Sequence, residues 1–180
     1  VARENNKGRS VENTKVWSPN KVQKNSGNIF GTIYHITYEH SANLSDSIEA
    51  RLNEVDNSLS PFNPESNISA INNNATDVPD ERMLHVFNLA KDISWKTDGA
   101  FDITVAPLVN LWGFGFDNES EVDAGKVDSI REFVGIDKIN YSDGKLIKSD
   151  ERVMLDCSAI AKGFGVDEIG KFLESKGIAN

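Results

Sequence analysis

Apolar residues recur along the chain at spacings that predict several helices. Between residues 44 and 59 the apolar side chains follow one another at intervals of four, four, three and four, which is the pattern of an amphipathic helix. Further helices are predicted from about residue 79 to Gly99, from about 120 to 134, and from just after Asp156 to Gly177. Residues 60–74 are rich in Ser, Asn and Pro, which predicts a loop with at most one helical turn.

Other stretches predict strands. Residues 29–38 read IFGTIYHITY, a β-branched and aromatic run typical of a strand. Residues 136–141 and 145–148 flank Ser142-Asp143-Gly144, which is a hairpin signal, and residues 152–156 predict a further short strand. Together these elements predict an α+β layered fold, with helices packed on a mixed or antiparallel sheet. Because a helix followed by Gly-Ile normally leads into another strand, we expect this sheet to be incomplete at the C-terminus.

Composition excludes several classes of protein. The 180 residues are 38% hydrophobic and carry a net charge of -9, which suits one globular core and argues against non-specific binding of nucleic acid. The single cysteine excludes an internal disulfide framework and a zinc site built on paired cysteines. The sequence contains no run of roughly 18 apolar residues, so it predicts no transmembrane helix.

The charge is unevenly distributed. In residues 1–28, six basic residues stand against two acidic ones, a net of +4, which leaves -13 for residues 29–180. The first segment has few apolar residues and no periodicity, so we interpret residues 1–28 as an extended arm and residues 29–180 as the folded body. The arm is either a frayed terminus or a tether that holds the body off a membrane.

The stretch from Leu155 to Gly165 carries the most chemical information. A predicted strand ends in Asp156, small residues follow, and a helix begins near Lys162 and two glycines. The start of a helix attracts anions through its backbone N–H groups and dipole, and small side chains let a phosphate approach closely. Lys162 would add a positive charge, and Asp156 could accept a hydrogen bond from a ribose or a base. The alternative is a purely structural turn with Lys162 in solvent.

Two other segments are candidates for ligand binding. Residues 97–108 place two carboxylates and two hydroxyls around a glycine, which is typical either of a binding loop or of a helix end with solvated side chains. Residues 111–116 interleave three aromatic residues with two glycines, which predicts either a flat pocket for a planar ligand or a plug of the core. The three histidines have no metal-ligand spacing.

In combination, these segments resemble the ApbE family, the FAD:protein FMN transferases. The resemblance covers about residues 28–180 and rests on pieces that occur in the family's order. These pieces are Phe30-Gly31-Thr32, LSPFN at 59–63, SNISAIN at 66–72, GAFDITVAPLVNLWGFG at 99–115 and LDCSAIAKG at 155–163.

The resemblance implies an enzyme that binds FAD and Mg²⁺, cleaves the pyrophosphate, releases AMP and attaches FMN to a Thr or Ser of an acceptor protein. The acceptors would be flavin-carrying subunits of membrane redox complexes. By position, it implies that the magnesium ligand is the main-chain carbonyl of Ala159, and that the FAD-binding residues are Phe30, Phe62, Ala100, Phe101, Asp102, Asp156 and Lys162. It also suggests an exported periplasmic lipoprotein anchored to the membrane.

The chain departs from the family in two respects. Phe62 stands where the family often has Tyr, so stacking on the flavin would survive without a hydroxyl hydrogen bond. The family's later motifs, which include the Asp and Thr that complete the magnesium site and a His-containing motif, have no counterpart here. We therefore expect this chain alone to be inactive and a full-length parent to be the enzyme. An FAD pyrophosphatase that gives FMN and AMP, a non-catalytic flavin-binding protein and a structural module without ligand are the alternatives.

Overall fold

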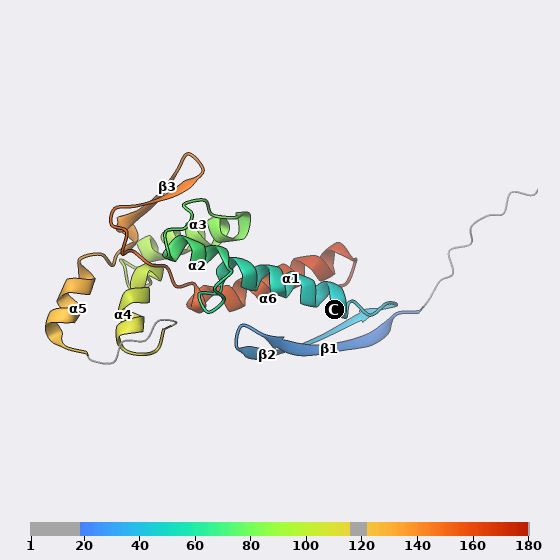
Figure 1. The fold of residues 1–180 in the computed structure, drawn as a ribbon. Coiled ribbons are helices and arrows are strands. Elements are labelled where there is room, and N and C mark those ends of the chain that lie inside the picture. The colour runs from blue at the N-terminus through green and yellow to red at the C-terminus, as the bar shows by residue number, and fades with distance from the viewer. Residues whose placement is uncertain (1–18, 116–121, 180) are drawn as a thin grey trace, which may run out of the picture.

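The computed structural model describes residues 19–115 and 122–179, and Figure 1 shows their arrangement. Helices α1 and α6 pack side by side, and the β1–β2 hairpin lies along them. In chain order the helices and strands are β1 (Lys21–Ile29), β2 (Thr32–His40), α1 (Ser45–Leu59), α2 (Asn67–Asn72), α3 (Glu81–Lys96), the 3₁₀ turn η1 (Ile103–Val105), α4 (Ala106–Leu111), α5 (Ala124–Arg131), the 3₁₀ turn η2 (Ile136–Lys138), β3 (Ile139–Ser142), β4 (Lys145–Lys148) and α6 (Ser158–Ser175).

The fold is α+β, as the sequence predicts, and the strands of the described residues form two separate antiparallel hairpins. Strand β1 pairs with β2 from Lys21↔His40 to Ile29↔Thr32. Strand β3 pairs with β4 around Asp143-Gly144, both of which have positive φ, as a two-residue mirror-image turn requires. The second hairpin therefore confirms its sequence prediction.

The predicted boundary after residue 28 is wrong for residues 21–28. They form β1 and pair with β2 along their whole length, although most of their side chains are exposed and their sequence shows no apolar alternation. Backbone pairing with β2 accounts for this strand. Residues 1–18 of the predicted arm lie outside the described residues.

The predicted strand at residues 152–156 is also wrong. The segment is buried at Val153 and Leu155, yet it pairs with no strand of the described residues. Instead, the Asn72 side chain donates to the Leu155 carbonyl at 2.8 Å and accepts from the Leu155 N–H at 2.7 Å, while the Asp156 N–H donates to the Ile103 carbonyl at 2.7 Å. A buried side-chain amide thus replaces the neighbouring strand.

The helices near their predicted positions have identifiable ends. Helix α3 begins after Asp80, whose carboxylate accepts from the Met83 N–H at 2.8 Å, and Pro79 lies just outside it. Helix α6 ends at Ser175, and just beyond it the positive φ of Gly177 and a 3.1 Å bond from the Ile178 N–H to the Leu173 carbonyl close the last turn. The helix predicted from about residue 120 to 134 is shorter in the structure, where α5 covers Ala124–Arg131.

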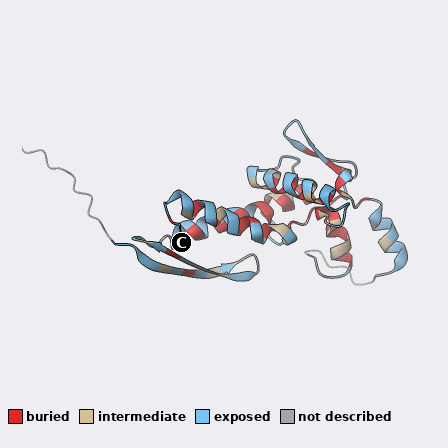
Figure 2. Cartoon of the chain, turned by 180° about the vertical axis from the view of Figure 1, so that it is seen from behind, coloured by how far each residue is buried: buried red, intermediate tan, exposed pale blue. Residues whose placement is uncertain are grey.

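Two apolar clusters hold these elements together. The larger lies between α1, α2, α3, the β3–β4 hairpin and the start of α6, and the smaller joins β2, the first half of α1 and the end of α6. Figure 2 shows the buried residues concentrated where α1 and α6 face each other, whereas the β1–β2 hairpin is mostly exposed. Phe30, in the turn between β1 and β2, packs against both clusters and so links the hairpin to the helices.

Candidate functional site

A first cleft, of about 400 Å³, lies between the β1–β2 turn, the end of α1 and the start of α6. Three of the residues predicted to bind FAD line it together: Phe30, Phe62 and Lys162. The remaining lining residues are Gly31, Asp56, Leu59, Ser60, Pro61, Asn63, Ser158 and Ala161. Residues 30, 62 and 162 are far apart in the sequence, so their convergence supports the prediction that they serve one ligand.

Phe62 stands on a turn that hydrogen bonds hold in place. The Ser66 hydroxyl donates to the Ser60 carbonyl at 2.7 Å, and the Ser69 hydroxyl donates to the Asn63 carbonyl at 2.8 Å. The Phe62 side chain remains 62% exposed at the mouth of the cleft. A rigid turn that presents an exposed aromatic ring suits stacking on a planar ligand.

A second cleft, of about 620 Å³, lies between the Gly99–Val109 segment, the end of α5 and the start of α6. It collects the other predicted residues: Ala100, Phe101, Asp102, Asp156 and Ala159. Ser158, the first residue of α6, lines both clefts, so they meet at the start of that helix. An extended ligand with an aromatic group at each end and charge in the middle would match this arrangement.

Asp102 has a structural role in addition to its predicted one. Its Oδ1 accepts from the Thr104 N–H and hydroxyl, both at 2.7 Å, and its Oδ2 accepts from the Ile136 N–H at 2.9 Å. Thr104 in turn accepts from the Gly135 N–H at 2.7 Å. These bonds join η1 to the segment before β3 and so shape one wall of the second cleft.

The start of α6 combines an acidic turn with a buried thiol. Asp156 Oδ1 accepts from the Ser158 N–H at 2.7 Å, which fixes the entry of the chain into the helix. Burial raises the pKa of the adjacent Cys157 thiol to about 12, and the Asp156 charge acts in the same direction. Cys157 is therefore a core residue and not a nucleophile at neutral pH.

Lys162 lies one turn into α6, and its side chain is exposed. Within the part of the chain that the structure describes, no carboxylate forms an ion pair with its ammonium group. An exposed cation near the positive end of a helix is a favourable place for an anion, and anion binding at Lys162 stays a prediction.

The described residues do not provide a magnesium site by themselves. Ala159 offers a single main-chain carbonyl, whereas Mg²⁺ takes about six oxygen ligands. Across residues 19–115 and 122–179, no group of three or more acidic, His or Cys side chains is placed to hold a metal ion. The predicted role of Ala159 thus requires further ligands from elsewhere.

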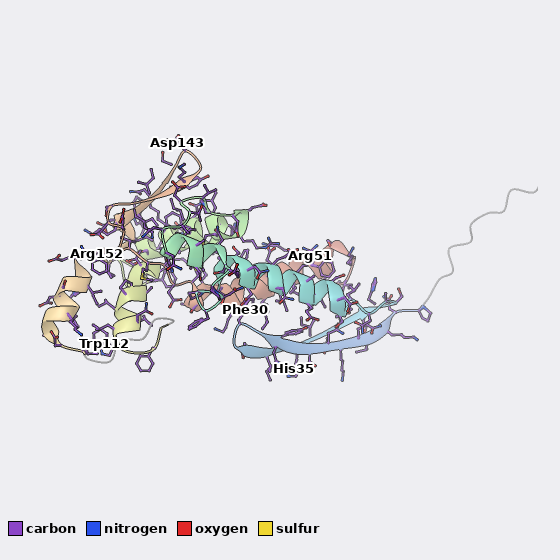
Figure 3. The ribbon with its side chains drawn as sticks, in the orientation of Figure 1. Phe30, His35, Arg51, Trp112, Asp143 and Arg152 are labelled. Atoms are coloured by element: carbon purple, nitrogen blue, oxygen red, sulfur yellow. The ribbon has the colours of Figure 1, made fainter. Side chains whose placement is uncertain are left out.

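Some features of the site were missed from the sequence. Arg131, an exposed residue at the end of α5, lines the second cleft, and no motif predicted it. Ser158 lines both clefts and is not among the predicted FAD-binding residues, although it belongs to the LDCSAIAKG segment at 155–163. Conversely, Trp112 and Phe114 are exposed and line neither cleft, and Figure 3 shows Trp112 beside α4, apart from Phe30. Phe116 lies outside the described residues.

No helix of the described residues combines the length and the apolar character needed to cross a bilayer.

Comparisons with known proteins place this geometry in a family. The chain is 34% identical over 166 residues to an FAD:protein FMN transferase of Vibrio cholerae (86% of this chain, 50% of the relative) and 34% identical over 177 residues to one of Haemophilus influenzae (89% and 51%). The chain thus spans about half the length of these curated relatives.

Solved structures give the same result. The flavin transferase ApbE from Vibrio cholerae superposes with a TM-score of 0.83 at 32% identity, over 90% of this chain and 56% of that one. The apo form of the Pseudomonas stutzeri flavinyl transferase ApbE superposes with a TM-score of 0.79 at 27% identity, over 89% and 57%. The model of the ApbE family matches residues 30–180. The chain therefore belongs to the ApbE family.

Proposed function

We propose that a full-length protein containing this chain transfers FMN from FAD to a Thr or Ser hydroxyl of an acceptor protein and releases AMP. One observation carries the proposal: two clefts with aromatic residues in their walls meet at the start of α6, beside Lys162. FAD has two ring systems joined by a pyrophosphate, so each ring system would have an aromatic wall and the pyrophosphate would lie near Lys162. The names of the similar transferases support the same activity.

The chemistry is a displacement at phosphorus. The acceptor hydroxyl oxygen attacks the phosphorus of the FMN half, the bond from that phosphorus to the bridging oxygen breaks, and AMP leaves with the bridging oxygen. The hydroxyl proton is lost to a base. In this scheme, Lys162 and the N–H groups at the start of α6 hold the negatively charged pyrophosphate, while Phe30 and Phe62 contact a ring of the ligand and hold it in place.

We further propose that transfer depends on Mg²⁺, with the Ala159 carbonyl as one ligand. Since Ala159 supplies a single oxygen, the other ligands would come from residues outside the described ones. EDTA should abolish the activity of the full-length protein, and excess Mg²⁺ should restore it. Activity that survives EDTA would contradict the magnesium proposal.

The decisive experiment follows both products of FAD. We expect the full-length protein, incubated with FAD, Mg²⁺ and an acceptor subunit of a membrane redox complex, to release AMP and make the acceptor fluorescent in a denaturing gel. AMP release without covalent flavin would indicate water as the attacker, hence a pyrophosphatase. FAD that binds and stays intact would indicate a flavin carrier.

Lys162→Ala tests the anion site within this scheme. Loss of one charge-assisted contact should weaken FAD binding by about tenfold, while the urea midpoint of unfolding stays unchanged because the side chain is exposed. The matched control is Lys171→Ala, an exposed lysine further along α6 that lines none of the clefts. Unchanged affinity in Lys162→Ala would remove this lysine from the site.

We also propose that the protein is exported and held at the membrane by a lipid anchor, with acceptors at the same surface. Residues 1–20, which precede β1, carry four basic residues against two acidic ones, and this supports a tether near anionic lipids. Cys157 is buried and cannot carry the anchor, so the anchored residue would lie outside the printed sequence. Fractionation of cells with and without an inhibitor of lipoprotein processing tests this, and a protein found only in the cytoplasm would contradict it.

A further inference from the structure

Helix α6 contains glycines in its interior, which weaken a helix relative to alanine. At Gly163 and Gly170 a Cβ atom would meet nothing within 4 Å, so packing does not account for these two residues. At Gly165 a Cβ atom would lie 2.9 Å from Cε2 and 3.2 Å from Cζ of the Phe30 ring. Gly165 is therefore the interior glycine of α6 whose missing side chain makes room for another residue.

Phe30 itself adopts an unfavourable backbone conformation. Its φ is +54° and that of Gly31 is +67°, and the flanking residues Ile29 and Thr32 pair with each other. This is a two-residue mirror-image turn, for which Asn-Gly is the usual sequence, and a bulky residue with positive φ is a genuine outlier. Contacts of the side chain must offset that cost, and the ring packs against both apolar clusters and against Gly165.

The position of the ring matters for the ligand because Phe30 forms part of the wall of the first cleft. It also lines an adjoining groove of about 520 Å³ between the hairpin and α6, so the ring separates two open spaces. Figure 3 shows Phe30 at the end of the hairpin, directly beside the helices. Because there is open space on two sides of the ring, its position depends on how well it packs against the surface of α6 at Gly165.

We propose that Gly165 is a positioning residue for flavin binding: the bare helix surface at residue 165 seats the Phe30 ring so that it forms the wall of the FAD cleft. This inference rests on the proposed function. Outside its own helix, the three atoms nearest to a methyl group at position 165 would be Cε2 and Cζ of the Phe30 ring and, at 3.7 Å, Cδ2 of Leu52, all of them side-chain atoms. The ring, as the movable partner, would shift toward one of the spaces while the fold is kept.

The test is a double-mutant cycle on FAD affinity, measured by flavin fluorescence in the full-length protein. Gly165→Ala should weaken FAD binding by about three- to tenfold, the range expected for losing one aromatic contact. In a Phe30→Ala background the same substitution should have no further effect, because the ring that it displaces is gone. Gly170→Ala, which adds the same methyl group to the same helix in open space, should bind FAD like the unaltered protein.

A second readout does not depend on FAD. The ¹³C-labelled Phe30 ring signals should move in Gly165→Ala and stay in place in Gly170→Ala. Unmoved ring signals, unchanged affinity, or an equal loss of affinity in the Phe30→Ala background would each overturn the inference. Moved signals in a protein that binds no FAD would support the seating of the ring and refute the proposed function. If Gly165→Ala fails to fold, recovery of folding in the double variant with Phe30→Ala would support the inference, and failure there too would overturn it.

Discussion

Replacement of Asp102 by alanine should lower the stability of the protein even in the absence of a ligand. The Asp102 carboxylate accepts from the N–H groups of Thr104 and Ile136 and from the Thr104 hydroxyl, and these two residues are 0% and 8% exposed. A buried N–H left without an acceptor costs about 1–3 kcal/mol. For two such groups we expect the free energy of unfolding to fall by about 3 kcal/mol. This value lies in the lower half of the range for two unpaired N–H groups, because the adjoining cleft lets water reach part of the space that the carboxylate leaves.

Asp102→Asn should cost less, about 1–2 kcal/mol, because its amide retains one oxygen acceptor but turns an NH₂ group toward a former donor. The control is Asp167→Ala on the exposed face of α6, for which we expect a change within about 0.5 kcal/mol.

Urea unfolding followed by tryptophan fluorescence measures these differences. With a slope of about 2 kcal/mol/M, Asp102→Ala should lower the midpoint by ~1.5 M at unchanged slope. FAD titration of the folded variants runs in parallel. If the midpoint of Asp102→Ala stays at that of the unaltered protein while FAD affinity falls, the carboxylate acts mainly on the ligand, and the reasoning from its three hydrogen bonds is refuted.

Two further predictions concern ionisable groups whose pKa is shifted by full or partial burial. Because burial raises the pKa of Cys157 to about 12, the native thiol should react with a disulfide reagent at pH 8 at least ~100-fold more slowly than the urea-unfolded chain; equal rates would contradict its burial at the start of α6. Burial lowers the pKa of Lys148 from 10.5 to about 8, against the opposing charge of Glu151. The unfolded chain then binds more protons between pH 8 and 10.5, so Lys148 should make stability rise with pH through this window. Lys148→Met should remove that contribution, exposed Lys171→Met should keep it, and an identical pH dependence in all three proteins would refute the assignment.

The elements that sequence could predict are those that depend on local signals. The apolar spacing between residues 44 and 59 identifies α1, and Asp143-Gly144 identifies the β3–β4 turn, since each pattern contains its own structural cause. Strand β1 has no such pattern and forms through its pairing with β2. The path of residues 152–156 is set by Asn72, some 83 residues away, which no local pattern reveals.

The candidate site was predictable as a set of residues and not as a shape. The resemblance selects Phe30, Phe62 and Lys162, and the structure brings them to one cleft. It also selects Asp102 and Asp156, which line another. The division into two clefts that meet at Ser158 depends on where the β1–β2 turn and the Gly99–Val109 segment sit around α6, and that placement follows from packing across the whole chain.

The β1–β2 turn shows why local propensity fails at this site. Propensity alone would place Asn or Gly at residue 30, and the run IFGTIY reads instead as one uninterrupted strand. Sequences depart from local preference where another requirement outweighs it, which is most often at functional sites. At residue 30 that requirement is a ring that lies against α6 at Gly165 and lines the cleft. The positive φ of Phe30 and the glycine at residue 165 then have the same cause. Both place an aromatic ring in the wall of the cleft beside Lys162.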